Sequence, residues 1–329
     1  MSLTLIDKLW YGAHPLRWLL WPFSLVYQGI VVFRRHYLQC FQTIFSVPVI
    51  VVGNITVGGV GKTPLVIALA HAFQSRGLRV GIVSRGYGAE VVDYPYEVTS
   101  DDDAAMVGDE PLLLVKKTGC PVVIAPKRVK AVDYLLTHHQ SQIILSDDGL
   151  QHYAMGRAIE IAVIDGIRGV GNGYSLPAGP LREGVERLQH VDFVVINGAS
   201  RTRMPLKTKT YQMDLVPGEI MALANSKKVC VSELAMPVAA MAAIGHPQRF
   251  FSTLKGMGLA FNEYSFKDHH PYKPEDLSFA ERTIVMTEKD AVKCLPFATK
   301  EMYFVPVDAQ IESDFWTALW NHKHLQGYI

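Results

Sequence analysis

Residues 47–69, which read VPVIVVGNITVGGVGKTPLVIAL, decide the fold. The β-branched run 47–52 predicts a buried strand, and the apolar residues after Pro64 have helical spacing. A glycine-rich turn ending in Lys-Thr lies between them. Strand, glycine turn and helix, in that order, are what a phosphate-binding loop requires. We therefore expect a nucleoside triphosphate to bind here.

Such a loop binds phosphate through inward-turned backbone N–H groups and through the positive end of the following helix. Lys62 would reach the β- and γ-phosphates, and the Thr63 hydroxyl would hold Mg²⁺. Thr56 replaces the first glycine of the usual pattern, so a plain strand-to-helix turn is the alternative. The expected nucleotide-binding residues are Thr56, Val57, Gly58, Gly59, Val60, Gly61, Lys62 and Thr63.

The composition favours a globular protein without a nucleic-acid partner. The chain has 329 residues, of which 49% are hydrophobic and 19% charged, as in a protein of two domains. A net charge of +1 gives no overall attraction to nucleic acid. The four cysteines are far apart and form no CxxC pair. We therefore expect neither a zinc site nor a disulfide framework, and a reducing cytoplasm is the default.

The amino-terminal segment, 1–45, differs from the rest. Sixteen uncharged residues between Arg17 and Arg34, interrupted by Pro22, fall short of the roughly 20 that a membrane span needs. Basic residues outnumber the single acid, Asp7, and several tryptophans and tyrosines are present. These features favour an interfacial anchor on anionic lipid. Helices packed on the protein's own core, or a single span, are the alternatives.

Further strands alternate with helical stretches, which predicts a parallel sheet covered by helices on both faces. The apolar strand 143–148 ends in Asp147 and Asp148. This pair suits a Walker B element, whose acid holds the Mg²⁺ of the nucleotide, and acids on a surface turn are the alternative. Arg128 follows the strand 121–125, where it is placed to meet phosphate.

Two other polar segments draw attention. The Gly- and Pro-rich segment 166–187 is unusually long, as functional loops are. Near its end are Arg182 and Glu183. Arg182 could supply a cation for the transferring phosphate, and Glu183 could supply a further Mg²⁺ ligand. Asp109 and Glu110 precede a proline, and their spacing alone favours helix capping over catalysis.

The fold class is α/β, with a P-loop NTPase-type parallel sheet. We divide the chain into a membrane-docking helical segment at 1–45 and a P-loop kinase core at 46–209. A hairpin linker follows at 210–223, and a smaller α/β lobe with a C-terminal helix occupies 224–329.

Together the motifs resemble those of the lipid A 4′-kinases (tetraacyldisaccharide 4′-kinases) of Gram-negative bacteria. The Thr56 departure is itself a trait of that family. The matching motifs, in the family's order, are GNITVGGVGKTP at 53–64, SRGYG at 84–88, VGDEP at 107–111, DDGLQH at 147–152, PAGPLRE at 177–183, DHH at 268–270 and TEKD at 287–290.

The resemblance implies a reaction and its residues. It implies transfer of the ATP γ-phosphate to the 4′-hydroxyl of an acylated glucosamine disaccharide 1-phosphate, at the cytoplasmic face of the bacterial inner membrane. It further implies roles by position. Asp109 is the catalytic base with His269 as its partner; Asp147, Asp148 and Glu183 bind magnesium; Arg128 and Arg182 are phosphate-side cations. The sequence does not separate His269 from His270, and we take the one directly after Asp268.

An acceptor with four acyl chains stays in the bilayer, because each buried CH₂ contributes about 0.8 kcal/mol. The enzyme must therefore reach the membrane surface, which the apolar amino terminus allows. The strongest alternative is a membrane-attached P-loop ATPase switch that acts on a protein partner. A second alternative is a lipid-interaction protein without enzymatic activity. We expect no nucleic-acid partner and no obligatory protein partner.

Overall fold

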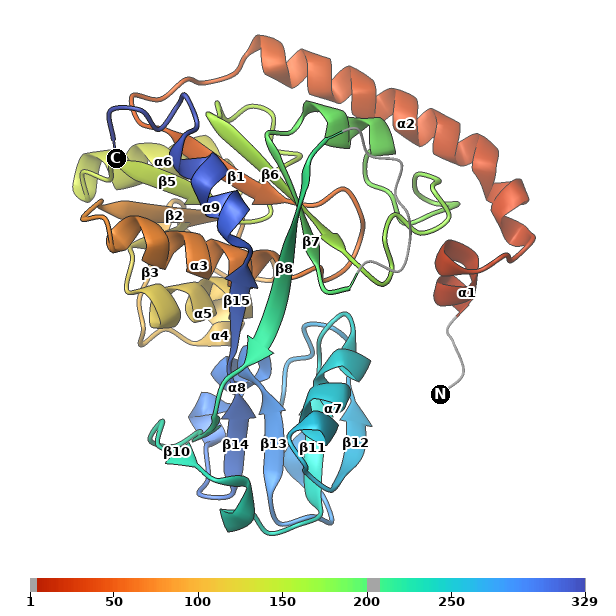
Figure 1. Cartoon of the computed structure of the whole chain (residues 1–329), viewed down its shortest axis with the longest axis vertical. Helices are drawn as coiled ribbons and strands as arrows, with labels where there is room; N and C mark the ends of the chain where they lie inside the picture. Colours follow the sequence, from red (N-terminus) through yellow and green to blue (C-terminus); the bar gives the residue numbers. More distant parts are fainter. Residues whose placement is uncertain (1–4, 200–207, 329) are drawn as a thin grey trace.

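The computed structural model describes residues 5–199 and 208–328. Three stretches lie outside the described residues: 1–4 of the predicted docking segment, 200–207 of the predicted core and 329 of the predicted smaller lobe. The chain forms two sheets, each with its own helices (Figure 1). We call the larger sheet with its helices the first lobe and the smaller one the second lobe.

The sheet of the first lobe has the strand order β15-β8-β7-β6-β1-β5-β2-β4-β3. Strands β8 to β4 in this order pair in parallel, and the two edge strands pair antiparallel. The predicted parallel sheet is thus confirmed, with antiparallel edges. The strands are β1 (Val49–Gly53), β2 (Val80–Ser84), β3 (Tyr96–Val98), β4 (Val122–Ile124), β5 (Ile143–Ser146), β6 (Ile159–Asp165), β7 (Phe193–Asn197), β8 (Thr210–Pro217) and β15 (Val307–Ile311).

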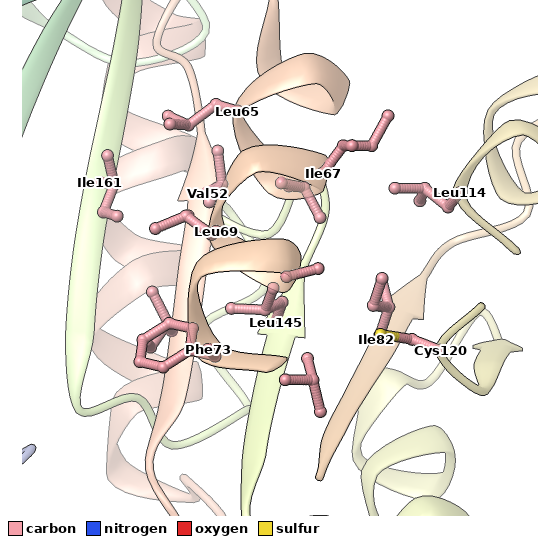
Figure 2. Packing of buried hydrophobic residues seen from close by; sticks show 14 of the residues in the cluster. Val52, Leu65, Ile67, Leu69, Phe73, Ile82, Leu114, Cys120, Leu145 and Ile161 are labelled. Atoms are coloured by element: carbon pink, nitrogen blue, oxygen red, sulfur yellow. The ribbon is translucent and has the colours of Figure 1, made fainter. Parts of the chain in front are cut away.

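Helices cover both faces of this sheet, as predicted. Successive side chains of a strand point to opposite faces. Accordingly, Val52 packs in the core beneath α3, whereas Val51 packs in the core beneath α6. Figure 2 shows Leu69 and Phe73 of α3 against the strands. The helices of this lobe are α3 (Lys62–Gln74), α4 (Ala104–Val107), α5 (Asp109–Thr118), α6 (Arg128–His138) and α9 (Ser313–Trp320), with the 3₁₀ helix η1 (Val185–His190).

The second lobe repeats this arrangement on a smaller scale. Its sheet has the order β10-β9-β14-β13-β11-β12, and α7 and α8 pack on opposite faces. Its elements are β9 (Ile220–Ala222), β10 (Lys228–Val229), η2 (Val231–Glu233), β11 (Val238–Ala242), α7 (Pro247–Gly256), β12 (Phe261–Ser265), η3 (Pro274–Leu277), β13 (Ile284–Thr287), α8 (Glu288–Cys294), η4 (Leu295–Phe297) and β14 (Met302–Val305).

The boundaries between the lobes differ from the prediction. Strands β8 and β9 belong to different sheets, so 210–223 is a crossing between lobes and not a hairpin. The chain crosses back at Pro306, because β14 lies in the second lobe and β15 in the first. The two crossings are joined by a hydrogen bond from Gly218 N–H to the Pro306 carbonyl, 2.9 Å long. Residues 307–328 therefore belong to the first lobe.

The amino terminus forms α1 (Leu5–Tyr11) and α2 (Leu16–Cys40). Helix α2 lies across the first lobe (Figure 1), and it continues through Pro22, which the sequence analysis took as an interruption. Among its residues only Ser24 is buried. The alternative of an apolar helix packed on the protein's own core therefore does not hold for α2. By length and composition, α2 is long and apolar enough to cross a membrane.

Gly53, the last residue of β1, is packed too closely to accept a side chain. An added Cβ would lie 2.8 Å from the backbone nitrogen of Leu150. We expect Gly53→Ala to lower the free energy of unfolding by about 1–3 kcal/mol, because either strand or neighbour must move. Thermal melting measures this loss. Gly256→Ala is the control, since no described atom beyond its chain neighbours and its own helix backbone lies within 4 Å of its added Cβ. Equal melting temperatures for the two variants would contradict the packing argument.

Candidate active site

The glycine loop after β1 has the backbone of a phosphate-binding loop. Gly58 and Gly61 have φ of +110° and +92°, a region that favours glycine. At Gly61 the approach is also close, because an added Cβ would lie 2.4 Å from Nδ2 of Asn197. Helix α3 begins directly after it, at Lys62. The predicted order of strand, loop and helix is confirmed.

Segment 166–187 holds this loop in place. The N–H of Val57 donates to the carbonyl of Pro180 at 2.9 Å, and Thr56 forms a β-bridge with Leu181. Extended backbone at this point suits a β-branched residue, which gives a physical reason for threonine where the usual pattern has glycine. The loop and segment 166–187 are therefore built as one unit.

Cations surround the carboxylate of Asp148. Lys62 Nζ lies 3.5 Å from its Oδ1, and Arg182 Nη1 lies 3.1 Å from its Oδ2. Burial alone would raise the pKa of Asp148, but Lys62, Arg182 and Arg128 outweigh it and lower the pKa to about 2. Asp148 is therefore ionised, and the structure brings these four predicted residues together.

Asp147 is the more deeply buried acid of the pair. The Thr63 hydroxyl donates to its Oδ2 at 3.2 Å, while its Oδ1 has no hydrogen-bond partner among the described residues. Burial, with the negative charge of Glu110 as the next contribution, raises its pKa to about 7. An unpartnered carboxylate oxygen beside the hydroxyl of a phosphate-binding loop is chemically suited to a bound cation. The residues present thus fit Mg²⁺.

Arg128 is buried at the start of α6, with 3% of its surface exposed. Its Nη1 donates to the backbone carbonyl of Asp148 at 2.8 Å, and burial lowers its pKa to about 10. Its Nε has no partner among the described residues. A buried donor of this kind is costly unless an acceptor reaches it, and a phosphate oxygen is a suitable acceptor.

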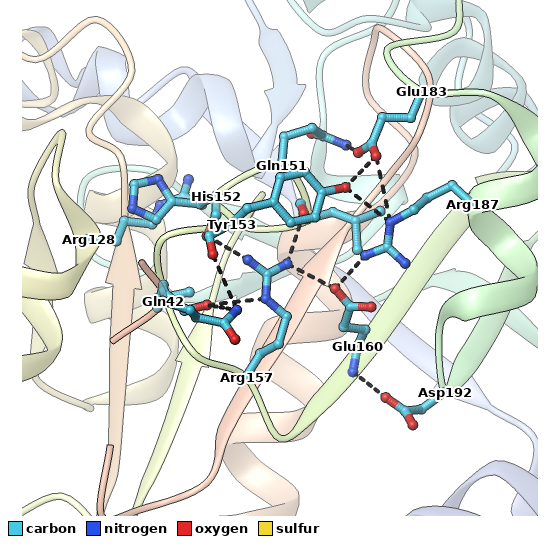
Figure 3. A network of polar contacts seen from close by, with 12 residues as sticks. Gln42, Arg128, Gln151, His152, Tyr153, Arg157, Glu160, Glu183, Arg187 and Asp192 are labelled. Carbon is cyan, nitrogen blue, oxygen red and sulfur yellow. Dashed lines mark hydrogen bonds and ion pairs between the residues drawn. The ribbon is translucent and has the colours of Figure 1, made fainter. Parts of the chain in front are cut away.

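Glu183, predicted as a Mg²⁺ ligand, has partners of its own in the structure. Its carboxylate accepts hydrogen bonds from the hydroxyl of Tyr153 and from Nε2 of Gln151, and Arg187 Nε lies 3.6 Å away (Figure 3). No group of three His, Cys, Asp or Glu side chains suited to a metal is found in the described part of the chain. The metal role of Glu183 therefore stays a prediction. Its partners fix the end of segment 166–187.

Asp109 and His269 form a pair across the two lobes. Asp109 is the first residue of α5, whereas His269 lies in the loop after β12. The His269 Nδ1 atom is 3.0 Å from each carboxylate oxygen of Asp109. Burial would raise the pKa of Asp109, but the hydrogen bond from His269 and the charge of Lys289 outweigh it and lower the pKa. His270 instead contacts Asp276, 3.1 Å away.

Lys289 is a site residue that the sequence analysis missed. Its Nζ lies 3.0 Å from Oε1 of Glu110 and 3.3 Å from Nε2 of His269. It belongs to the TEKD motif, whose Thr287 caps α8 by accepting from the N–H of Asp290. The one sequence signal that Lys289 belongs to the site is that TEKD is among the motifs of the family.

Comparison with known proteins identifies the family. Residues 16–324 match the model of the LpxK family, tetraacyldisaccharide-1-P 4'-kinase. The chain belongs to this family. Membership confirms the motif resemblance and, with it, the prediction of an ATP-dependent kinase.

Individual relatives agree with this assignment. A tetraacyldisaccharide 4'-kinase of Legionella pneumophila (strain Corby) is 54% identical over 325 residues, which cover 98% of each protein. One from Shewanella sp. (strain MR-7) is 49% identical over 319 residues, covering 95% of this chain and 93% of its own. A crystal structure of LpxK from Aquifex aeolicus in complex with ATP has a TM-score of 0.77 and 26% identity, covering 94% of this chain and 99% of that one.

Asp147 leads to a prediction about stability and pH. Its pKa of about 7 in the folded protein lies above the roughly 3.9 of an unfolded aspartate. The folded state therefore binds the extra proton, and without divalent cations stability falls as pH rises from about 4 to about 7. Asp147→Asn should remove this fall. Thermal melts across that range measure it, and Mg²⁺ should restore the wild-type melting temperature at the upper end but have little effect on the variant.

Asp148→Asn is the matched control for this measurement. Because the pKa of Asp148 is about 2, below its unfolded value, its contribution to stability is lost only as pH falls through that range. The charge of Asp148 also makes a smaller upward contribution to the pKa of Asp147, so the Asp148→Asn protein should keep a fall in stability above pH ~4, shallower than in wild type. If Asp147→Asn shows the same slope as wild type, the raised pKa of Asp147 is wrong.

Proposed function

We propose that this protein transfers the γ-phosphate of ATP to the 4′-hydroxyl of an acylated glucosamine disaccharide 1-phosphate at a membrane surface, in lipid A biosynthesis. The observation that carries the proposal is the hydrogen-bonded pair of Asp109 and His269, which can act as a general base, beside a complete phosphate-binding loop. Helix α5 leads into the parallel strand β4, so its first residue lies at the carboxyl edge of the sheet. Strands β1 and β5 deliver the loop and the two aspartates to that same edge.

The donor side of the reaction is assigned to the first lobe. Lys62 and the backbone of residues 56–63 bind the β- and γ-phosphates. Arg128 and Arg182 offset the negative charge that the transferring phosphoryl group carries. Thr63 and Asp147, with Asp148 beside them, would hold Mg²⁺. When bound, this ion neutralises phosphate charge and orients the nucleotide.

The acceptor side is assigned to Asp109. A sugar hydroxyl is a poor nucleophile, so a positioned base contributes roughly 10²–10⁴-fold to the rate. The lowered pKa of Asp109 keeps this buried carboxylate ionised and able to accept the hydroxyl proton. His269 donates from Nδ1 and thereby fixes the orientation of the carboxylate. A switch ATPase would instead activate water, and it would need no base positioned for an acceptor alcohol.

Helix α2 supports the lipid part of the proposal. Five of its apolar residues recur at i, i+4, i+7, i+11 and i+14, which places them on one face of a helix. Each is at least 60% exposed: Leu19, Phe23, Val26, Ile30 and Phe33. An exposed apolar stripe of this length suits burial in the acyl boundary of one leaflet, and no acidic residue lies in α2. Since ATP is the donor, the membrane face is the cytoplasmic one.

Segment 166–187 connects this helix to the phosphate site. The Ser24 hydroxyl donates to the carbonyl of Ser175 at 2.8 Å, and the N–H of Ala178 donates back to Ser24 at 3.1 Å. A few residues later the same segment supplies Arg182, which contacts Asp148. One segment thus links α2 to the groups that handle phosphate. An acceptor held in the leaflet beside α2 would lie near those groups.

Substitution of Lys62 and Asp109 tests the catalytic assignment. We expect Lys62→Ala and Asp109→Asn each to lower γ-phosphate transfer by at least roughly 100-fold, through loss of phosphate charge compensation and of the base. The assay follows labelled phosphate from ATP into an acylated disaccharide acceptor. Lys228→Ala, an exposed lysine paired with Glu219 in the second lobe, is the control. Undiminished transfer by Asp109→Asn would remove the base assignment.

The same assay separates a kinase from a switch. A kinase should consume ATP mainly when the acylated disaccharide is present. ATP hydrolysis at an unchanged rate without that lipid, with no phosphate in the lipid fraction, would favour the ATPase switch.

Charging the apolar stripe tests membrane docking. We expect Leu19→Glu/Phe33→Glu to lower binding to vesicles of phosphatidylethanolamine and phosphatidylglycerol by roughly tenfold or more, since two large side chains no longer enter lipid. Cosedimentation measures the bound fraction. Met236→Glu/Leu295→Glu, a matched pair of exposed apolar residues in the second lobe, should bind as wild type does. Equal losses in both double variants would show that added charge, and not the stripe, governs binding.

A further inference from the structure

Lys289 has four polar neighbours, which come from both lobes. In the first lobe, Glu110 Oε1 is 3.0 Å and Asp109 Oδ2 is 3.8 Å from its Nζ. In the second lobe, His269 Nε2 is 3.3 Å and Asp268 Oδ1 is 3.8 Å away. Burial would lower the pKa of Lys289, but the surrounding carboxylates outweigh it and raise the pKa. The ammonium group is therefore charged throughout the neutral range.

We propose that Lys289 is a positioning residue of the phosphoryl transfer, which donates to Nε2 of His269 and so holds that ring in the neutral form protonated at Nδ1. The proposal rests on the roles of Asp109 and His269 assigned above. It adds a third member to their pair.

The nearest contact of His269 Nε2 is the ammonium of Lys289 at 3.3 Å, with Oδ1 of Asp268 farther away at 3.9 Å, and this geometry favours one arrangement of protons. An ammonium group has only donors, so the ring nitrogen that faces it must accept. The proton of the neutral ring is then on Nδ1, from which it donates to Asp109. An imidazolium would instead direct its Nε2 proton at the ammonium 3.3 Å away. His269 thus orients Asp109 and offers no path by which the accepted proton leaves through Nε2.

The other charged groups around the ring act in both directions. The hydrogen bond to Asp109 is the largest contribution and holds the pKa of His269 above its usual value, while burial and the charge of Lys289 act to lower it. Asp268 adds a smaller upward contribution, and the ring of Tyr87 packs beside the imidazole, 5.4 Å away between centroids. Removal of the lysine charge must therefore raise the proton affinity of the Asp109–His269 pair.

A structural role for Lys289 can be separated from this electrostatic one. Helices α5 and α8 carry a second ion pair, Lys117 with Glu288, at 3.1 Å. Its lysine is about as exposed as Lys289, with 22% against 20% of the side chain, but Lys117 is not among the hydrogen-bond or ion-pair partners of His269. Lys117→Met is therefore the matched control for Lys289→Met. Glu110→Gln weakens the Lys289 ion pair as well, yet keeps the lysine charge beside the ring.

The deciding measurement is the pH dependence of kcat for transfer to an acylated disaccharide. Lys289→Met should move the acid limb upward by about one pH unit or more and lower kcat roughly 10- to 100-fold, with KM for ATP nearly unchanged. Lys289→Arg should restore the acid limb of wild type. Lys117→Met and Glu110→Gln should not move it upward.

Nitrogen-15 spectra of the histidine rings give a readout independent of activity. His269 is identified among the 12 histidines by subtraction of the His269→Asn spectrum. In wild type its Nδ1 should carry a proton and its Nε2 none at the pH of the assay. In Lys289→Met the Nε2 atom should stay protonated up to a pH about one unit higher than in wild type.

Two results would overturn the proposal. One is an acid limb that moves equally in Lys289→Met and Lys117→Met, which would make Lys289 a structural tie. The other is an Nε2 proton in wild type with the same titration as in Lys289→Met. Full activity of Asp109→Asn would instead remove the base assignment itself, so failure of the proposed function is recognised separately.

Discussion

Burial of negative charge at the carboxyl edge of the first sheet is the constraint on which the rest of the structure depends. Asp147 and Asp148 follow a fully buried strand, and two adjacent carboxylates repel each other unless cations or donors lie beside them. The compensating groups are Lys62, Arg128 and Arg182. They come from the starts of α3 and α6 and from segment 166–187. Each of these segments must reach the same edge, so charge compensation and the arrangement of the nucleotide site are one requirement.

Segment 166–187 meets that requirement and a second one. It pairs with the glycine loop through Val57, and it holds the one buried side chain of α2, Ser24. A segment of this length, whose regular structure is limited to the start of η1, would be costly to order without anchors. Glu183 provides one anchor, through its buried contacts with Tyr153 and Arg187. The carboxylate predicted as a metal ligand thus supports the segment that positions Arg182.

Features encoded locally could be predicted from the sequence, and those that depend on distant partners could not. The strand, loop and helix around Lys62 follow from residue types within one short stretch. The sheet to which β8 or β9 belongs is set by pairing with strands far along the chain, so a hairpin was expected where the chain crosses between lobes. The contacts of Glu183 and Lys289 could not be predicted for the same reason, because they depend on residues far along the chain. His269 and His270 are adjacent in sequence, and only the fold separates their contacts.

The division of the site between lobes separates nucleotide binding from proton acceptance. The groups assigned to ATP and Mg²⁺ all lie in the first lobe, so that half of the site is complete without the second. Asp109 also lies in the first lobe, but the groups that orient it, His269 and Lys289, come from the second. The lobes approach closely at the loop as well, since a Cβ on Gly245 would lie 2.9 Å from Gly59 N. Contact between the lobes therefore governs the base more than the nucleotide, since His269 and Lys289, which contact Asp109, come from the second lobe.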